Sequence, residues 1–128
     1  MEKDFDRWNT IKKKTHGKKM PPLFSEREVW WCTLGINIGS EEDGKGSGYL
    51  RPVLVVRKFN KDIFYGLPIT SNKKDSKFYL IIDSGSIQGS VILSQMRLID
   101  AKRLSHLLGK ITDKELDETK KKLKALFP

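Results

Sequence analysis

The stretch RPVLVVRKFNKDIFYGLPITS, residues 51–71, reads as two apolar strands joined by a short polar turn. Residues 51–58 and 63–70 are rich in β-branched and aromatic side chains, which favour strands. The turn between them falls at Asn60-Lys61, where a polar pair suits a hairpin loop. The stretch therefore predicts an antiparallel hairpin at the centre of the fold.

The rest of the chain adds short strands on both sides of this hairpin. Further strands are expected at residues 27–34, 77–82 and 90–99, and a single helical turn at residues 100–104. Residues 35–50 hold five glycines and three consecutive acids, so they form a long loop. Many short strands with turns between them predict a mainly β (α+β) fold, a small antiparallel barrel or sheet capped by helices.

The C-terminal segment carries the clearest helix signal. Thr112 and Glu115 have the spacing of a capping box, and Ile111 can pack on Leu116 across the helix start. Apolar residues then recur at helical spacing as far as Leu126. The pattern predicts a terminal helix with one face packed inward.

The N-terminal segment, residues 4–16, carries a narrower helical stripe made by Phe5, Trp8 and Ile11. Gly17 is expected to end this helix. Two interpretations stay open: a short amphipathic helix packed on the domain, or a basic arm that touches nucleic acid.

The chain is strongly basic. Its 25 Lys and Arg against 16 Asp and Glu give a formal net charge of +9 and a sequence pI of about 9.7. An excess of this size favours an acidic partner, such as nucleic acid, an anionic membrane surface or an acidic protein. A single cysteine excludes a disulfide within the chain, which fits a cytoplasmic protein. No apolar run approaches a membrane span and no secretory signal is visible.

Several motifs almost fit and are rejected. Residues 39–46 resemble a P-loop, but Gly46 stands where the magnesium-binding hydroxyl belongs, and three acids lie inside the loop. The same acids lack the alternation of a calcium-binding EF-hand. Cys32 lies mid-strand between aromatic residues and is expected to be a buried core thiol. With only His16 and His106, a histidine acid–base pair or a metal cluster is not expected.

The remaining candidate functional side chains lie at the open end of the predicted hairpin. Arg51 begins one strand, and Thr70 and Ser71 end the other, so a guanidinium and hydroxyls converge at one sheet edge. Such a set suits a phosphate. From the pattern alone, the interpretation of an ordinary edge arginine and a strand-ending threonine remains open.

Four motifs in register give a family resemblance. They are W-W-x-x-L-G-x-N-I-G-S-E at residues 30–41, R-P-V-L-V-V at 51–56, L-P-I-T-S at 67–71 and V-I-L-S-Q-M-R-L-I-D at 91–100. In this order, over roughly residues 25–127, they resemble the MazF/PemK/Kid family of toxin endoribonucleases from type II toxin–antitoxin systems.

The resemblance implies an SH3-like barrel with a C-terminal helix, acting as a homodimer. The barrel domain would span residues 25–128, behind a basic N-terminal extension with a short helix at residues 1–24. The implied activity is sequence-specific cleavage of single-stranded RNA, often mRNA, without a metal or other cofactor. Arg51 and Thr70 fall on the catalytic positions. The implied or expected substrate-binding residues are Asn37, Ser40, Lys45, Tyr49, Ser71 and Gln95.

The expected chemistry is attack by a ribose 2′-OH on its own phosphate, which gives a 2′,3′-cyclic phosphate and a 5′-OH. The expected regulator is a cognate antitoxin whose acidic, partly disordered segment covers the RNA groove. Two alternatives keep the fold and change the function: a non-catalytic RNA-binding barrel, and a gyrase-targeting toxin.

Overall fold

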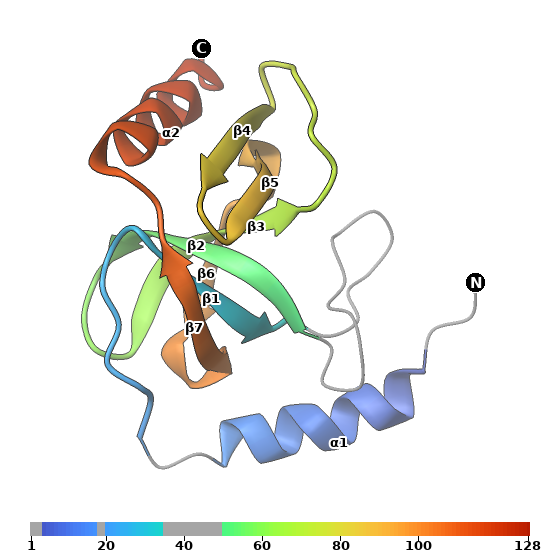
Figure 1. Cartoon of the computed structure of the whole chain (residues 1–128). Helices are drawn as coiled ribbons and strands as arrows, with labels where there is room; N and C mark the ends of the chain where they lie inside the picture. The colour runs from blue at the N-terminus through green and yellow to red at the C-terminus, as the bar shows by residue number, and fades with distance from the viewer. Residues whose placement is uncertain (1–3, 18–19, 35–49) are drawn as a thin grey trace.

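A computed structural model of the chain describes residues 4–17, 20–34 and 50–128, and Figure 1 shows its elements. In chain order they are α1 (Phe5–His16), β1 (Glu28–Thr33), β2 (Leu50–Lys58), β3 (Ile63–Thr70), β4 (Tyr79–Ser84), β5 (Ile87–Ile92), the 3₁₀ turn η1 (Leu93–Gln95), β6 (Arg97–Asp100), the 3₁₀ turn η2 (Ala101–Arg103), β7 (Leu104–Lys110) and α2 (Asp113–Ala125). None of the helices in these residues is long and apolar enough to cross a membrane.

The seven strands form one antiparallel sheet with the order β4-β5-β3-β2-β1-β7, and β6 pairs with the other half of β3. Figure 1 shows the sheet curling, with α2 beside β4 and α1 on the opposite side. This confirms the predicted mainly β fold with a helix at each end. Within the described residues β4 and β7 do not pair with each other, so the strand path stays open.

The central hairpin has the predicted bounds to within one residue. Strands β2 and β3 pair antiparallel with Val53 opposite Pro68. Asn60 closes the turn, because its Oδ1 accepts hydrogen bonds from the backbone N–H groups of Asp62 and Ile63 at 2.8 and 3.1 Å. The turn predicted from the sequence therefore forms because the asparagine side chain accepts hydrogen bonds from the backbone that follows it.

The prediction of one strand over residues 90–99 is wrong. Strand β5 ends at Ile92, and the chain turns through η1 before β6 begins at Arg97. At this break, the backbone N–H of Leu93 donates to the carbonyl of Phe78 at 2.8 Å. The two strands serve opposite ends of β3, because β5 pairs with its last residues and β6 with its first. The helical turn expected at residues 100–104 is confirmed as η2.

Two buried clusters lie on the two faces of the central strands. Alternation sends Val29 and Leu54 into the cluster beneath β4, β5 and α2, and Trp30 and Val53 into the opposite one. Cys32 belongs to the second cluster and is fully buried, as predicted for a core thiol. Both faces of the sheet are therefore used for packing.

Helix α2 begins with the predicted capping box. Thr112 Oγ1 accepts from the Glu115 N–H at 3.1 Å, and the Glu115 carboxylate accepts from the Thr112 N–H at 3.0 Å. The same carboxylate accepts from the Ser84 hydroxyl on β4, so the cap also ties α2 to the sheet. Burial disfavours the charged Glu115, but hydrogen bonds from Ser84, Thr112 and the Asp83 N–H outweigh it and lower the pKa of Glu115.

Helix α1 packs on the domain through Trp8, one residue of the predicted apolar stripe. Asp4 caps its start by accepting from the Arg7 N–H, and Trp8 is buried while Phe5 stays exposed. The Arg103 guanidinium lies 5.9 Å from the Trp8 ring centre and donates to the Thr33 carbonyl at 3.0 Å. The packed-helix interpretation is confirmed, and contact with nucleic acid stays a prediction.

Candidate functional site

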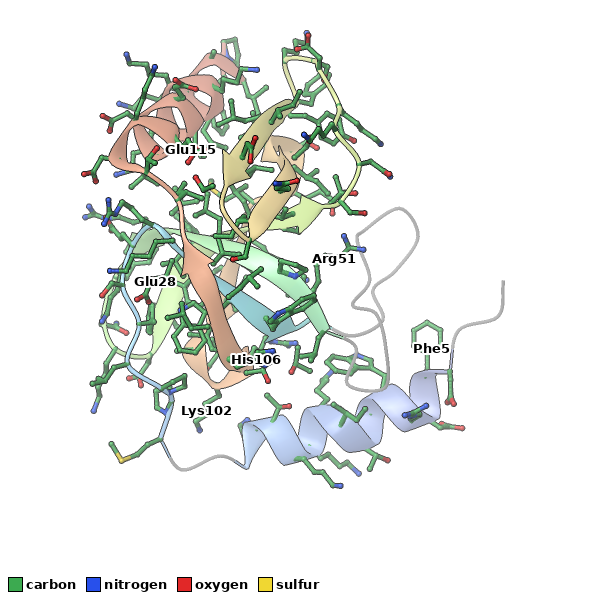
Figure 2. The ribbon with its side chains drawn as sticks, viewed as in Figure 1. Phe5, Glu28, Arg51, Lys102, His106 and Glu115 are labelled. Atoms are coloured by element: carbon green, nitrogen blue, oxygen red, sulfur yellow. The ribbon has the colours of Figure 1, made fainter. Side chains whose placement is uncertain are left out.

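Arg51 lies at the start of β2, where the strand pairs with the end of β1. Arg51 as a whole is only 6% exposed to solvent, which is unusual for an arginine. The guanidinium Nη1 donates to the main-chain carbonyl of Ile69 at 3.2 Å. That carbonyl directly precedes Thr70, so the guanidinium lies at the end of β3 (Figure 2). The predicted approach of the two hairpin ends is therefore present.

Thr70 is the last residue of β3, two residues beyond Pro68, where the pairing with β2 ends opposite Val53. Thr70 is half-buried. Its Oγ1 accepts a hydrogen bond from the Asn72 N–H at 3.4 Å. Strand β5 fixes the backbone from the other side, because Thr70 pairs with the buried Ser90. The threonine is thus held at the end of β3 by its pairing with β5.

An open pocket of about 410 Å³ lies at this end of the sheet. Its lining residues come from β1, β2, β3 and β5 and from the turn after β3: Trp31, Leu50, Arg51, Pro52, Ile69, Ser71 and Gln88. The lining is mostly apolar with a guanidinium, a hydroxyl and an amide among it, which is the usual make-up of a ligand site. Its polar groups are hydrogen-bond donors suited to a phosphate.

The pocket brings some predicted site residues together and leaves others aside. Arg51 and Ser71 line it, whereas Thr70 lies between two lining residues without being one itself. Gln95 is half-buried at the end of η1 and is not a lining residue. The predictions for Asn37, Ser40, Lys45 and Tyr49 fall outside the described residues, as does the acidic loop that contains them.

Five lining residues were not predicted from the sequence as site residues: Trp31, Leu50, Pro52, Ile69 and Gln88. Trp31 follows the buried Trp30, and alternation along β1 turns it to the other face of the sheet. That alternation was the available signal. Gln88 is an exposed residue beside the β4–β5 turn, and no sequence motif marks it.

No group of three or more His, Cys, Asp or Glu residues that could hold a metal ion occurs in residues 4–17, 20–34 and 50–128.

A sequence profile describing "PemK-like, MazF-like toxin of type II toxin-antitoxin system" matches residues 25–127. The chain belongs to this family. The match begins after α1, so that helix lies outside the part of the chain shared with the family. A comparison with curated protein sequences gave no significant match.

Solved structures of the same fold include members of the MazF group. The structure of MazF from Deinococcus radiodurans is 20% identical, with a TM-score of 0.66 over 82% of this chain and 96% of that one. A mycobacterial endoribonuclease in complex with its cognate antitoxin is 15% identical, with a TM-score of 0.62 over 83% and 98%. The MazE–MazF structure from D. radiodurans is 19% identical, with a TM-score of 0.63 over 82% and 95%.

Proposed function

We propose that this chain is a toxin endoribonuclease that cleaves single-stranded RNA at specific sequences without a metal ion. The observation that carries the proposal is the placement of the buried Arg51 guanidinium at the end of β3, beside an open pocket. Membership of the MazF-like toxin family supports it. Arg51 and Thr70 are the proposed catalytic residues.

The reaction needs little from the protein beyond positioning and charge stabilisation. The ribose 2′-OH loses its proton to solvent as its oxygen bonds to the adjacent phosphorus, the bond from phosphorus to the 5′-oxygen breaks, and the leaving oxygen takes up a proton from solvent, so that the protons balance. The products are a 2′,3′-cyclic phosphate and a 5′-OH. The transition state carries extra negative charge on the phosphoryl oxygens, which donors already in place stabilise. Arg51 supplies a fixed fork of N–H donors and Thr70 a hydroxyl.

Arg51 acts mainly as a stabiliser of charge in this proposal. A guanidinium resists deprotonation, with a pKa above about 12, so it is a poor general base. Its existing hydrogen bond to Ile69 fixes the side chain in place before substrate arrives. A preorganised donor of this kind does not need to reorient during the reaction.

Sequence specificity is proposed to come from the substrate-binding residues predicted from the sequence. Single-stranded bases are read by stacking and by hydrogen bonds to their exposed edges. The proposed readers are Asn37, Ser40, Lys45, Tyr49, Ser71 and Gln95.

The toxin is proposed to act in the cytoplasm as a homodimer and to be neutralised by a cognate antitoxin. The net charge of +9 fits an antitoxin with an acidic segment that competes with RNA. One structural neighbour, a mycobacterial endoribonuclease, has been solved with its cognate antitoxin. The helical extension before the family domain, residues 1–24, would be an addition to this common design.

The proposal is tested by incubating the purified protein with mixed single-stranded RNA in EDTA and mapping the new ends. Defined cuts bearing cyclic phosphate are expected. Intact RNA with retarded mobility would instead support a non-catalytic RNA-binding barrel. Intact and unbound RNA would contradict both and favour the gyrase-targeting alternative.

A further inference from the structure

Trp31 and His106 form a stacked ring pair across strands β1 and β7. They are direct partners in the strand register, and their ring centres lie 6.0 Å apart with 29° between the ring planes. The Ser105 Oγ lies 3.1 Å from His106 Nδ1 and holds the imidazole from the side. The indole therefore has an aromatic ring stacked against one side.

The same indole lines the pocket that Arg51 lines. Trp31 pairs with His106 on one side and with Pro52, the neighbour of Arg51, on the other. With strands about 4.8 Å apart, the backbones of His106 and Pro52 lie about 10 Å from each other on the two sides of β1. Figure 2 shows His106 on β7 and Arg51 at the start of β2. A flat aromatic surface and a guanidinium thus border one pocket.

We propose that Trp31 is a stacking platform for one nucleobase of single-stranded RNA, and that His106 positions it from behind. This inference rests on the proposed function and deepens it, because it names a base-binding subsite beside the scissile phosphate. A base entering the pocket lies on the indole while its phosphate reaches the donors of Arg51 and Ser71. Stacking of bases on aromatic side chains is the common way of holding single strands.

The charge of the surroundings favours RNA over a peptide as the occupant. Among the residues that the structure describes, the pocket lining offers a guanidinium, a hydroxyl and an amide, and no acidic side chain. The chain as a whole carries +9, which attracts a polyanion. A planar base joined to a phosphate satisfies both the ring and the donors in one ligand.

The test measures the affinity of the full chain for short 2′-O-methyl RNA oligomers, which lack the nucleophilic 2′-OH and cannot be cleaved. Each oligomer of U, A or C is compared with an abasic oligomer of equal length. The variants are Trp31→Leu and His106→Ala, with His16→Ala as the matched control. His16 is the other histidine, exposed at the end of α1.

The loss of affinity is expected to depend on the base. Trp31→Leu should weaken binding of base-containing oligomers about tenfold, His106→Ala less, and neither should change binding of the abasic oligomer. His16→Ala should leave the base-dependent difference as in the wild type. The salt dependence of binding should stay unchanged, because no phosphate contact is removed.

Two outcomes would overturn the platform. The first is that both variants bind base-containing oligomers as tightly as the wild type does. In that case the Trp31–His106 stack would serve another partner, such as the antitoxin, and not RNA. The other is an equal loss for base-containing and abasic oligomers, which would mean a structural role only. Failure of the proposed function is separate, since absence of RNA cleavage with base-dependent binding intact would remove the nuclease and keep the platform.

Discussion

Gly89 on β5 lies so close to Thr70 on β3 that a Cβ atom on the glycine would stand 2.0 Å from the Thr70 carbonyl oxygen. Gly89 also has a φ of +140°, a conformation that other residues rarely adopt. The two strands pair at this point, with Thr70 opposite the neighbouring Ser90. The absence of a side chain at Gly89 therefore sets the position of the proposed catalytic threonine.

Gly89→Ala should displace the end of β3 and reduce both stability and RNA cleavage. The added methyl group collides with backbone, which cannot move aside as a flexible side chain would. Gly85→Ala is the matched control, because Gly85 also has a positive φ of +61° but nothing within 4 Å of an added Cβ. Thermal unfolding and a cleavage assay should show a clearly larger loss at Gly89. Equal losses would mean that backbone strain, not contact with Thr70, matters there.

Arg51→Lys should lower the cleavage rate by about a hundredfold or more while part of the RNA affinity is kept. Lysine keeps the positive charge but loses the planar fork of donors, and losing one preorganised donor costs a factor of about this size. Arg57→Lys, at an exposed position on the same strand, should leave the rate unchanged. Single-turnover cleavage and RNA binding are measured on each protein. Wild-type turnover of the Arg51 variant would remove this side chain from the mechanism.

The central hairpin and the C-terminal helix could be predicted because their signals are local. The Asn60 side chain closes the turn itself, and Thr112 caps its own helix. The break after Ile92 could not be predicted, because the apolar pattern continues across it. Its cause lies in β3, which takes a different partner at each end. Strand β7 was missed because its leucines do not alternate with polar residues as in a half-buried strand, and most of its residues are exposed.

The site follows the same division. The meeting of Arg51 with the end of β3 follows from counting along one hairpin, and the structure contains it. The stack of Trp31 on His106 joins residues from β1 and β7, which become neighbours only through the whole sheet order. His106 lies in no recognisable motif, so the sequence does not indicate that it contacts Trp31.

Trp8→Ala should release α1 from the domain. Trp8 is the buried residue of this helix and packs beside Arg103, whereas the rest of the helix contributes exposed or half-buried side chains. Phe5→Ala removes an aromatic ring from the same helix at a position that is 53% exposed, so it is the matched control. Hydrogen exchange of the α1 amides should become much faster in the first variant and stay near wild type in the second. Slow exchange after loss of Trp8 would show that other contacts hold the helix.

Stability should fall in acid because of Glu115. Its folded-state pKa lies below the ordinary value of 4.5, so the unfolded chain binds a proton more readily than the folded one. The resulting stabilisation is fully present above about pH 4.5 and is lost as the pH falls through the lowered pKa. The free energy of unfolding, measured by urea titration across this range, should therefore decrease toward low pH.

Glu115→Gln should reduce stability at neutral pH and flatten that acid decrease. The amide keeps one acceptor oxygen, but it cannot match a carboxylate that accepts from Ser84 on β4 and from both the backbone and the side chain of Thr112. Glu118→Gln, an exposed change on the same helix, should leave the pH profile as in the wild type. An unchanged acid decrease in the Glu115 variant would assign the pH dependence to other carboxylates and limit Glu115 to its capping role.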